Sequence, residues 1–296
     1  MKKAILLTVL VLSTCVFGVE FSELAQSWEA RYGQEALKGY TLTMHPRQDA
    51  NSIRWLVPLE ETWKKSGDKY MVAGLVQIGD KVCESWVAYN GMDRKEFTHI
   101  SKPVGRRSVE PKSDSDLAMP RFEFVLGKAK TVHYSEGLES KVHRDSLLPG
   151  MQKAMTKYPE LYSIVKEEDA EVSGVRCLVF AYSEPYAEED STTLISKVAR
   201  RLWIDPNTAL IMKMENYRGD KRAGLMMEVL STSVSKGLVY PKKFAITFSG
   251  KEKDKCLYEV TSFVPNPALK DSDFSKSFPS GTRVIDQELG ISYIQP

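Results

Sequence analysis

Residues 201–217 read RLWIDPNTALIMKMENY and predict two strands joined by a tight turn. The strands are expected over Thr193–Ile204 and Thr208–Tyr217, with Asp205-Pro206-Asn207 as the turn, because Asp-Pro and Asn favour chain reversal. Side chains alternate between the two faces of a strand. Leu210, Met212 and Met214 therefore share one face of the second strand, and this face is apolar.

More strands with short connections flank this pair. Antiparallel pairing is favoured for all of them, since parallel neighbours need long crossovers. The segment Asn90-Gly91 is the strongest hairpin signal, because both residues tolerate the positive φ angles of a two-residue turn. The other predicted strands are Tyr40–Met44, Glu61–Lys65, Lys69–Gln77, Lys81–Tyr89, Arg94–His99, Gly174–Tyr182, Leu225–Val234, Leu238–Phe248 and Cys256–Val264.

Two helices, one loop and a closing hairpin complete the expected elements. Apolar residues spaced by three and four predict an amphipathic helix over 21–38, ended by Gly39, and a second helix over Leu147–Tyr158. Residues 101–120 contain prolines and charges without periodicity, and we expect a mobile loop there. Two short apolar runs predict a C-terminal hairpin at 282–294.

The N-terminus has the pattern of a secretory signal peptide over residues 1–18. Lys2 and Lys3 precede an apolar run that is too short to span a bilayer, and Val16 and Gly18 are the small residues before a cleavage site. We expect a periplasmic or otherwise exported protein that begins at Val19. The alternative is lipid anchoring at Cys15, because residues 12–15, LSTC, resemble a bacterial lipobox with Thr at the position before the cysteine.

Charge and cysteine content narrow the possible partners. The chain has 41 Lys+Arg and 39 Asp+Glu, so removing Lys2 and Lys3 leaves 39 of each sign. A balanced charge gives no electrostatic footprint for nucleic acid. Three cysteines remain after residue 18, namely Cys83, Cys177 and Cys256. Each lies in an apolar strand, which favours buried thiols, although one pair could form a disulfide after export.

Catalytic and metal-binding motifs are missing from the sequence. There is no nucleophile elbow, no His-Glu-x-x-His, no Cys-x-x-Cys and no phosphate-binding glycine loop. Adjacent carboxylates such as Glu60-Glu61 point to opposite faces of a strand and are expected in solvent. We therefore expect no enzyme, metal site or cofactor.

The apolar strand faces are the remaining candidates for a binding site. Methionine adapts its shape and suits surfaces that accept varied partners. An ordinary core beneath the two helices would give the same pattern, and both interpretations stay open at this point. The candidate ligand-binding residues are Trp203, Leu210, Met212, Met214, Phe244, Ile246 and Phe248.

Three segments in this order resemble the periplasmic lipoprotein-carrier superfamily, which includes LolA-like and RseB-like proteins. They are residues 201–217, the run GLVYPKK at 237–243 and the run FPSGTRVID at 278–286. The resemblance implies a mainly β (α+β) fold over residues 19–296, in which a long curved antiparallel sheet forms an open half-barrel with helices over its concave face. Such a fold holds an acyl chain or a lipoprotein in its hollow.

Three classes of function follow from these observations. The chain could be a carrier or sensor that binds a lipid or lipoprotein as its partner. It could instead be a structural module of the same fold, with a filled core and an envelope protein as partner. A hydrolase with a dispersed site is the third class, and the missing nucleophile motif argues against it.

Overall fold

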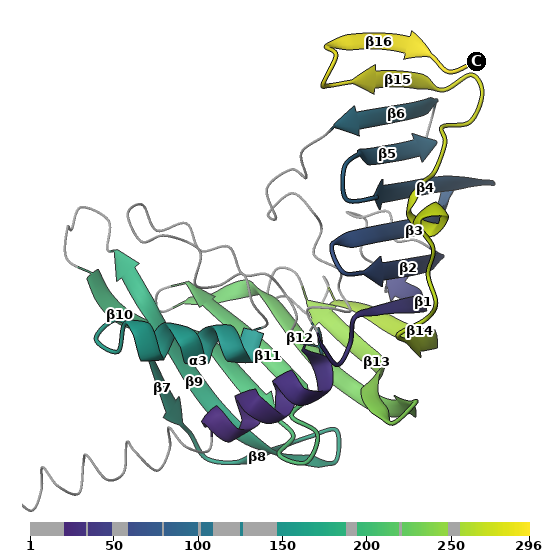
Figure 1. Cartoon of the computed structure of the whole chain (residues 1–296). Coiled ribbons are helices and arrows are strands. Elements are labelled where there is room, and N and C mark those ends of the chain that lie inside the picture. The colour runs from purple at the N-terminus through teal and green to yellow at the C-terminus, as the bar shows by residue number, and fades with distance from the viewer. Residues whose placement is uncertain are drawn as a thin grey trace, which may run out of the picture. The chain divides into compact units, whose positions relative to one another are not determined.

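The computed structural model describes residues 21–33, 35–48, 59–78, 80–99, 102–108, 125–126, 147–187, 194–218, 221–247 and 255–296. Within these described residues, sixteen strands form one open sheet, shown in Figure 1, with the order β16-β15-β6-β5-β4-β3-β2-β1-β14-β13-β12-β11-β10-β9-β7, and β8 pairs with β9. The expected fold class, mainly β with an open and predominantly antiparallel sheet and two helices, is confirmed.

Most strands overlap the predicted segments, whereas the strands at 163–166 and 170–172 were not predicted. In chain order they are β1 (Gly39–Gln48), β2 (Glu60–Ser66), β3 (Lys69–Ile78), β4 (Lys81–Tyr89), β5 (Arg94–His99), β6 (Pro103–Ser108), β7 (Ser163–Lys166), β8 (Ala170–Val172), β9 (Val175–Ala187), β10 (Leu194–Ile204), β11 (Ile211–Arg218), β12 (Lys221–Ser235), β13 (Leu238–Thr247), β14 (Lys255–Pro265), β15 (Arg283–Asp286) and β16 (Ile291–Ile294).

The turn between β4 and β5 forms where Asn90-Gly91 predicts it. Gly91 has a φ of 97°, a conformation that side-chain-bearing residues rarely adopt. The Asn90 side-chain oxygen accepts hydrogen bonds from the backbone N–H groups of Met92 and Asp93, at 2.9 and 2.7 Å. These bonds satisfy turn donors that have no partner in the ladder.

Strand β6 corrects the expectation of an irregular loop over 101–120. Residues 103–108 pair with β5 on one side and, in parallel, with β15 on the other. The sequence conceals this strand because its parallel partner lies about 180 residues later, at Arg283–Asp286. Residues 109–120 of the expected loop lie outside the described residues.

The first helix is shorter than predicted, covering residues 21–32 instead of 21–38. Gly39 begins β1, where a β-carbon would collide with the backbone oxygen of Lys65 on β2. The glycine thus permits close strand approach and does not cap a helix. The second helix, α3 (Leu147–Lys157), agrees with its prediction.

The residues group into two compact units. Unit 1 comprises Met1–Ala36, Ala118–Ser231 and Ile246–Asp254, and unit 2 comprises Leu37–Leu117, Thr232–Ala245 and Lys255–Pro296. The first helix and α3 belong to unit 1, and β12 and β13 contribute residues to both units.

A segment between β14 and β15 covers one face of the sheet in unit 2, and we call residues 266–282 the strap. Its Phe274 and Phe278 are buried in an apolar cluster with Trp86, Phe97 and Val284. The rings of Trp86 and Phe278 stack with centroids 5.6 Å apart. The C-terminal hairpin of β15 and β16 follows the strap, with the antiparallel pairing of two short strands.

Candidate functional site

One sheet face in unit 1 is apolar and closed by a helix. Its centre is a row of directly paired side chains on β9 to β12, which we call the covered row: Phe180, Leu202, Met214 and Met227. Each of the four is at most 1% exposed. Phe21 of the first helix meets Phe180 edge to face, with ring centroids 5.3 Å apart. The first helix therefore packs against the covered row at Phe180.

Apolar packing holds both helices in place, and Figure 1 shows them over the strands of unit 1. Trp28 is fully buried, and its indole N–H donates to the backbone oxygen of Leu126 at 2.7 Å. Apolar contacts are not directional, so a helix can shift without breaking the hydrogen bonds of the sheet. The buried helix residues are Phe21, Leu24, Ala25, Trp28 and Tyr32 on the first helix and Leu147, Leu148, Gly150, Met151 and Ala154 on α3.

A groove with a volume of about 640 Å³ lies between these two helices. Ala25 and Pro149 contribute apolar surface on opposite walls, and longer polar side chains complete the lining. The groove is an open surface depression whose exposed lining is mostly apolar. The lining residues are Ser22, Ala25, Gln26, Glu29, Pro149, Gln152, Lys153, Thr156 and Lys157.

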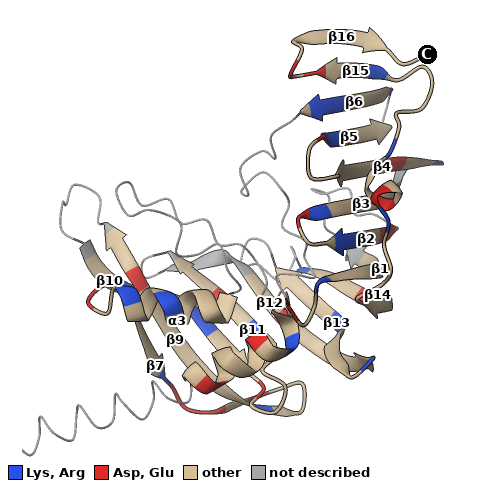
Figure 2. Cartoon of the chain, in the orientation of Figure 1, with Lys and Arg blue, Asp and Glu red and all other residues tan. Residues whose placement is uncertain are grey.

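The two walls of the groove differ in charge, as Figure 2 shows for the helices. Lys153 and Lys157 are four residues apart on α3 and project from the same side. The α3 sequence LLPGMQKAMTK contains no acidic residue. Glu29 is the charged residue of the opposite wall. The lining thus has two cations and one anion beside an apolar surface.

Most of the predicted site residues are buried. Leu210, Met212 and Met214 belong to unit 1 and are 0–1% exposed. Ile246 of unit 1 and Phe244 of unit 2 are 2% and 0% exposed. Burial agrees with the prediction of an apolar face, and it means that a ligand reaches Met212 and Met214 only after the surrounding packing rearranges.

Trp203 does not share the face of these methionines. It pairs across the sheet with Lys213, whose ammonium lies 4.5 Å from the centre of the indole ring. Met214 is adjacent to Lys213 on β11 and pairs with Leu202, so its side chain points to the opposite face from Trp203. A register irregularity between Trp203 and Ile204 interrupts the pairing at Met212. Phe248, the seventh candidate, lies outside the described residues, as do residues 1–18 and Cys15.

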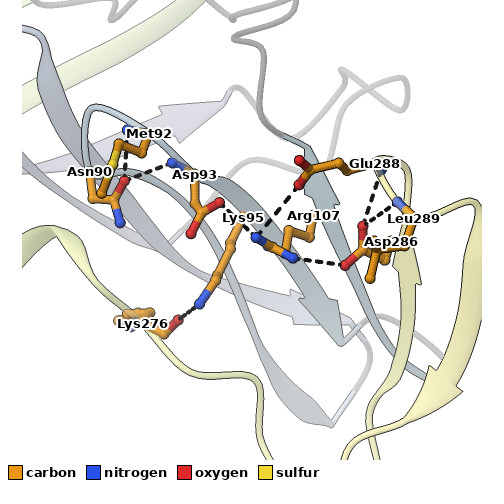
Figure 3. A network of polar contacts seen from close by, with 9 residues as sticks. All are labelled: Asn90, Met92, Asp93, Lys95, Arg107, Lys276, Asp286, Glu288 and Leu289. Atoms are coloured by element: carbon orange, nitrogen blue, oxygen red, sulfur yellow. Dashed lines mark hydrogen bonds and ion pairs between the residues drawn. The ribbon is translucent and has the colours of Figure 1, made fainter.

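A polar network in unit 2 joins β15 to its neighbours, as Figure 3 shows. The Arg107 guanidinium contacts Asp286 and Asp93 at 3.0 Å each, and Glu288 at 3.6 Å. Burial alone would raise the pKa of Asp286, yet the Leu289 backbone N–H and the Arg107 guanidinium lower it below its usual value. The arginine and its three carboxylates are paired with one another, which indicates a structural role at the β6–β15 junction.

The three cysteines of the described chain are buried, and no disulfide joins any two of them. Burial raises the pKa of Cys177 to about 12, so this thiol is protonated and unreactive at neutral pH. Within the described ranges, no three His, Cys, Asp or Glu residues are grouped as a metal site. None of the helices in those ranges is long and apolar enough to cross a membrane.

Sequence reasoning missed the groove. Its wall residues repeat at helical spacing beside each buried stripe, for example Ser22, Gln26 and Glu29. That spacing is the signal that could have selected them, but polar helix positions normally face solvent. Only the juxtaposition of the two helices distinguishes these residues from other exposed ones.

No protein-family model matches the chain, and no curated protein matches its sequence. Several solved structures are similar to this chain over most of its length. One is a DUF1329 family protein from Desulfovibrio piger, with 11% identity, a TM-score of 0.46 and coverage of 87% of this chain and 96% of that chain.

Two further solved structures are similar to most of this chain. A putative outer membrane lipoprotein-sorting protein domain from Vibrio parahaemolyticus has 13% identity and a TM-score of 0.46, with 86% and 95% of the two chains covered. A LolA superfamily protein from Nitrosomonas europaea has 12% identity and a TM-score of 0.42, with 86% and 97% covered.

Proposed function

We propose that this protein is an exported, non-catalytic binding protein that holds the acyl chain of a lipid or lipoprotein in the groove between its first helix and α3. The observation behind the proposal is the groove itself, which lies between two helices held by apolar packing. Residues 1–18 would be removed on export, and residues 19–296 would form the functional half-barrel.

The composition of the covered row supports this function. It contains two methionines, and the neighbouring residues Leu210 and Met212 are also buried. A chain that enters between the helices would meet this deformable surface once the helices part, because methionine adapts to irregular shapes. Met212 and Met214 are the residues that we expect to contact the inner end of this acyl chain.

A filled core with a structural role is the second candidate. The specific observation that favours it is the exposure of the covered row, which is at most 1% for each residue. Such packing matches an ordinary protein interior. In that case the groove is a surface feature, the protein binds no acyl chain, and an envelope protein is the partner.

Titration of the mature chain with a fluorescent fatty-acyl probe separates the two candidates. We expect saturable binding and its loss in Gln26→Trp, because Gln26 lines the groove and the indole would occupy the space. Glu23→Trp is the matched control, since Glu23 is an exposed residue of the same helix outside the groove lining. An absence of probe binding by the wild type, or equal binding by both variants, would contradict the proposal.

A further inference from the structure

The charges of the groove add information about the head group of its ligand. The inference deepens the proposed function and rests on it. Lys153 and Lys157 stand one helical turn apart in the lining of α3, next to apolar surface from Pro149 and Ala25. An amphiphile in this groove would place its chain against apolar atoms and its head beside these two lysine side chains, and the Lys157 ammonium also lies 5.0 Å from the centre of the Tyr158 ring.

One further charged residue of the groove lining determines its net charge. Glu29 is on the opposite wall, so the lining has a net formal charge of +1. The remaining lining residues, including Ser22, Gln152 and Thr156, are uncharged and offer hydroxyl or amide groups. The Oε1 atom of Gln152 is buried without a hydrogen-bond partner in the described structure, and a head-group hydroxyl could donate to it.

We infer that the groove selects a single-chain amphiphile whose head group is anionic, a carboxylate or a phosphate, through Lys153 and Lys157. Opposite charges at a partly exposed site attract each other weakly, so the two lysines tune selectivity while the apolar chain supplies most of the affinity. Glu29 opposes the same head group by like-charge repulsion.

Three ligands with the same palmitoyl chain test this inference on the mature protein: palmitate, palmitoyl-lysophosphatidylglycerol and palmitoyl-lysophosphatidylcholine. We expect the two anionic ligands to bind about tenfold more tightly than the zwitterionic one at low salt. Lys153→Gln and Lys157→Gln should each weaken binding of the anionic ligands about threefold. Glu29→Gln should strengthen it, which a general loss of folding would not do.

Arg31→Gln is the control, because Arg31 is an exposed cation of the first helix outside the groove lining. It should leave all three affinities unchanged. If the three ligands bind equally and the lysine variants have no effect, the head-group inference is wrong and the acyl-binding function stands. If none of the three ligands binds, the proposed function itself fails.

Discussion

The substitution Met212→Glu measures whether water reaches the apolar face beneath the helices. Met212 is 1% exposed, so the new carboxyl would enter a dry site. Desolvation disfavours the charged form and raises the pKa of a buried carboxyl. The neutral variant Met212→Gln has a similar size and serves as the control, because its cost does not depend on pH.

The expected loss of stability follows from the difference between the pKa of this carboxyl in the folded and in the unfolded chain. An unfolded chain ionises the new carboxyl with a pKa of about 4.3, whereas the folded chain keeps it protonated. Each pH unit above that value lowers the free energy of unfolding by about 1.4 kcal/mol until the raised pKa is reached. Relative to Met212→Gln, the deficit should be about 1 kcal/mol at pH 5 and about 4 kcal/mol at pH 7. A deficit of this size is a large part of the usual total stability of about 5–15 kcal/mol.

Urea unfolding followed by tryptophan fluorescence at pH 5, 6 and 7 provides the measurement. We expect the midpoint of Met212→Glu to fall with rising pH and that of Met212→Gln to change no more than the wild type. Equal stability of the two variants at pH 7 would show that the carboxylate stays hydrated. That result would refute the closed face and favour an open hollow in the ligand-free protein.

Three other substitutions or reagents test the remaining structure. Arg107→Met should cost about 1–3 kcal/mol at pH 7 by removing a partner of the buried Asp286, measured by urea unfolding. The folded-state pKa of Asp286 is lowered, so the stability that its carboxylate contributes is present above the unfolded-state pKa and is lost as pH falls through the lowered value. The destabilisation by Arg107→Met should therefore be smaller at pH 3 than at pH 7. Equal destabilisation at both pH values would contradict the pairing. Gly105→Ala places a β-carbon 2.5 Å from the Phe278 ring and should lower the free energy of unfolding by about 1–3 kcal/mol. In calorimetry, the double variant with Phe278→Leu should lose less stability than the sum of the two single variants. Additive losses of stability would contradict the contact. Cys177 should react with a thiol reagent only after denaturation, since its pKa is raised to about 12 by burial; rapid labelling of the native protein, located by mass spectrometry, would argue against this burial.

Local sequence patterns determined most of the strands. The Asn90-Gly91 turn and the Asp205-Pro206-Asn207 turn depend on residues that are neighbours in the chain, and both hairpins form where they were predicted. The helix α3 also follows from local spacing of apolar residues. Elements of this kind are predictable because their hydrogen bonds and turn conformations involve short sequence separations.

The candidate site was predictable only in part. Leu210, Met212 and Met214, which alternation assigns to one apolar face, are all buried, although a register irregularity interrupts the alternation at Met212. Trp203 was assigned to the same surface because it is close in sequence. Its cross-strand partner, Lys213, places it on the other face, and register of this kind is set between strands.

The sequence by itself determined the mainly β class, the two helical segments, the hairpin turns and the apolar strand faces, because each depends on local periodicity or turn chemistry. Only the tertiary structure decided that residues 103–108 form a strand, since Arg283–Asp286 pairs with them from a distant part of the chain. It also decided that Lys153, Lys157 and Glu29 line one groove. These features arise from long-range packing and strand pairing, which local patterns do not specify.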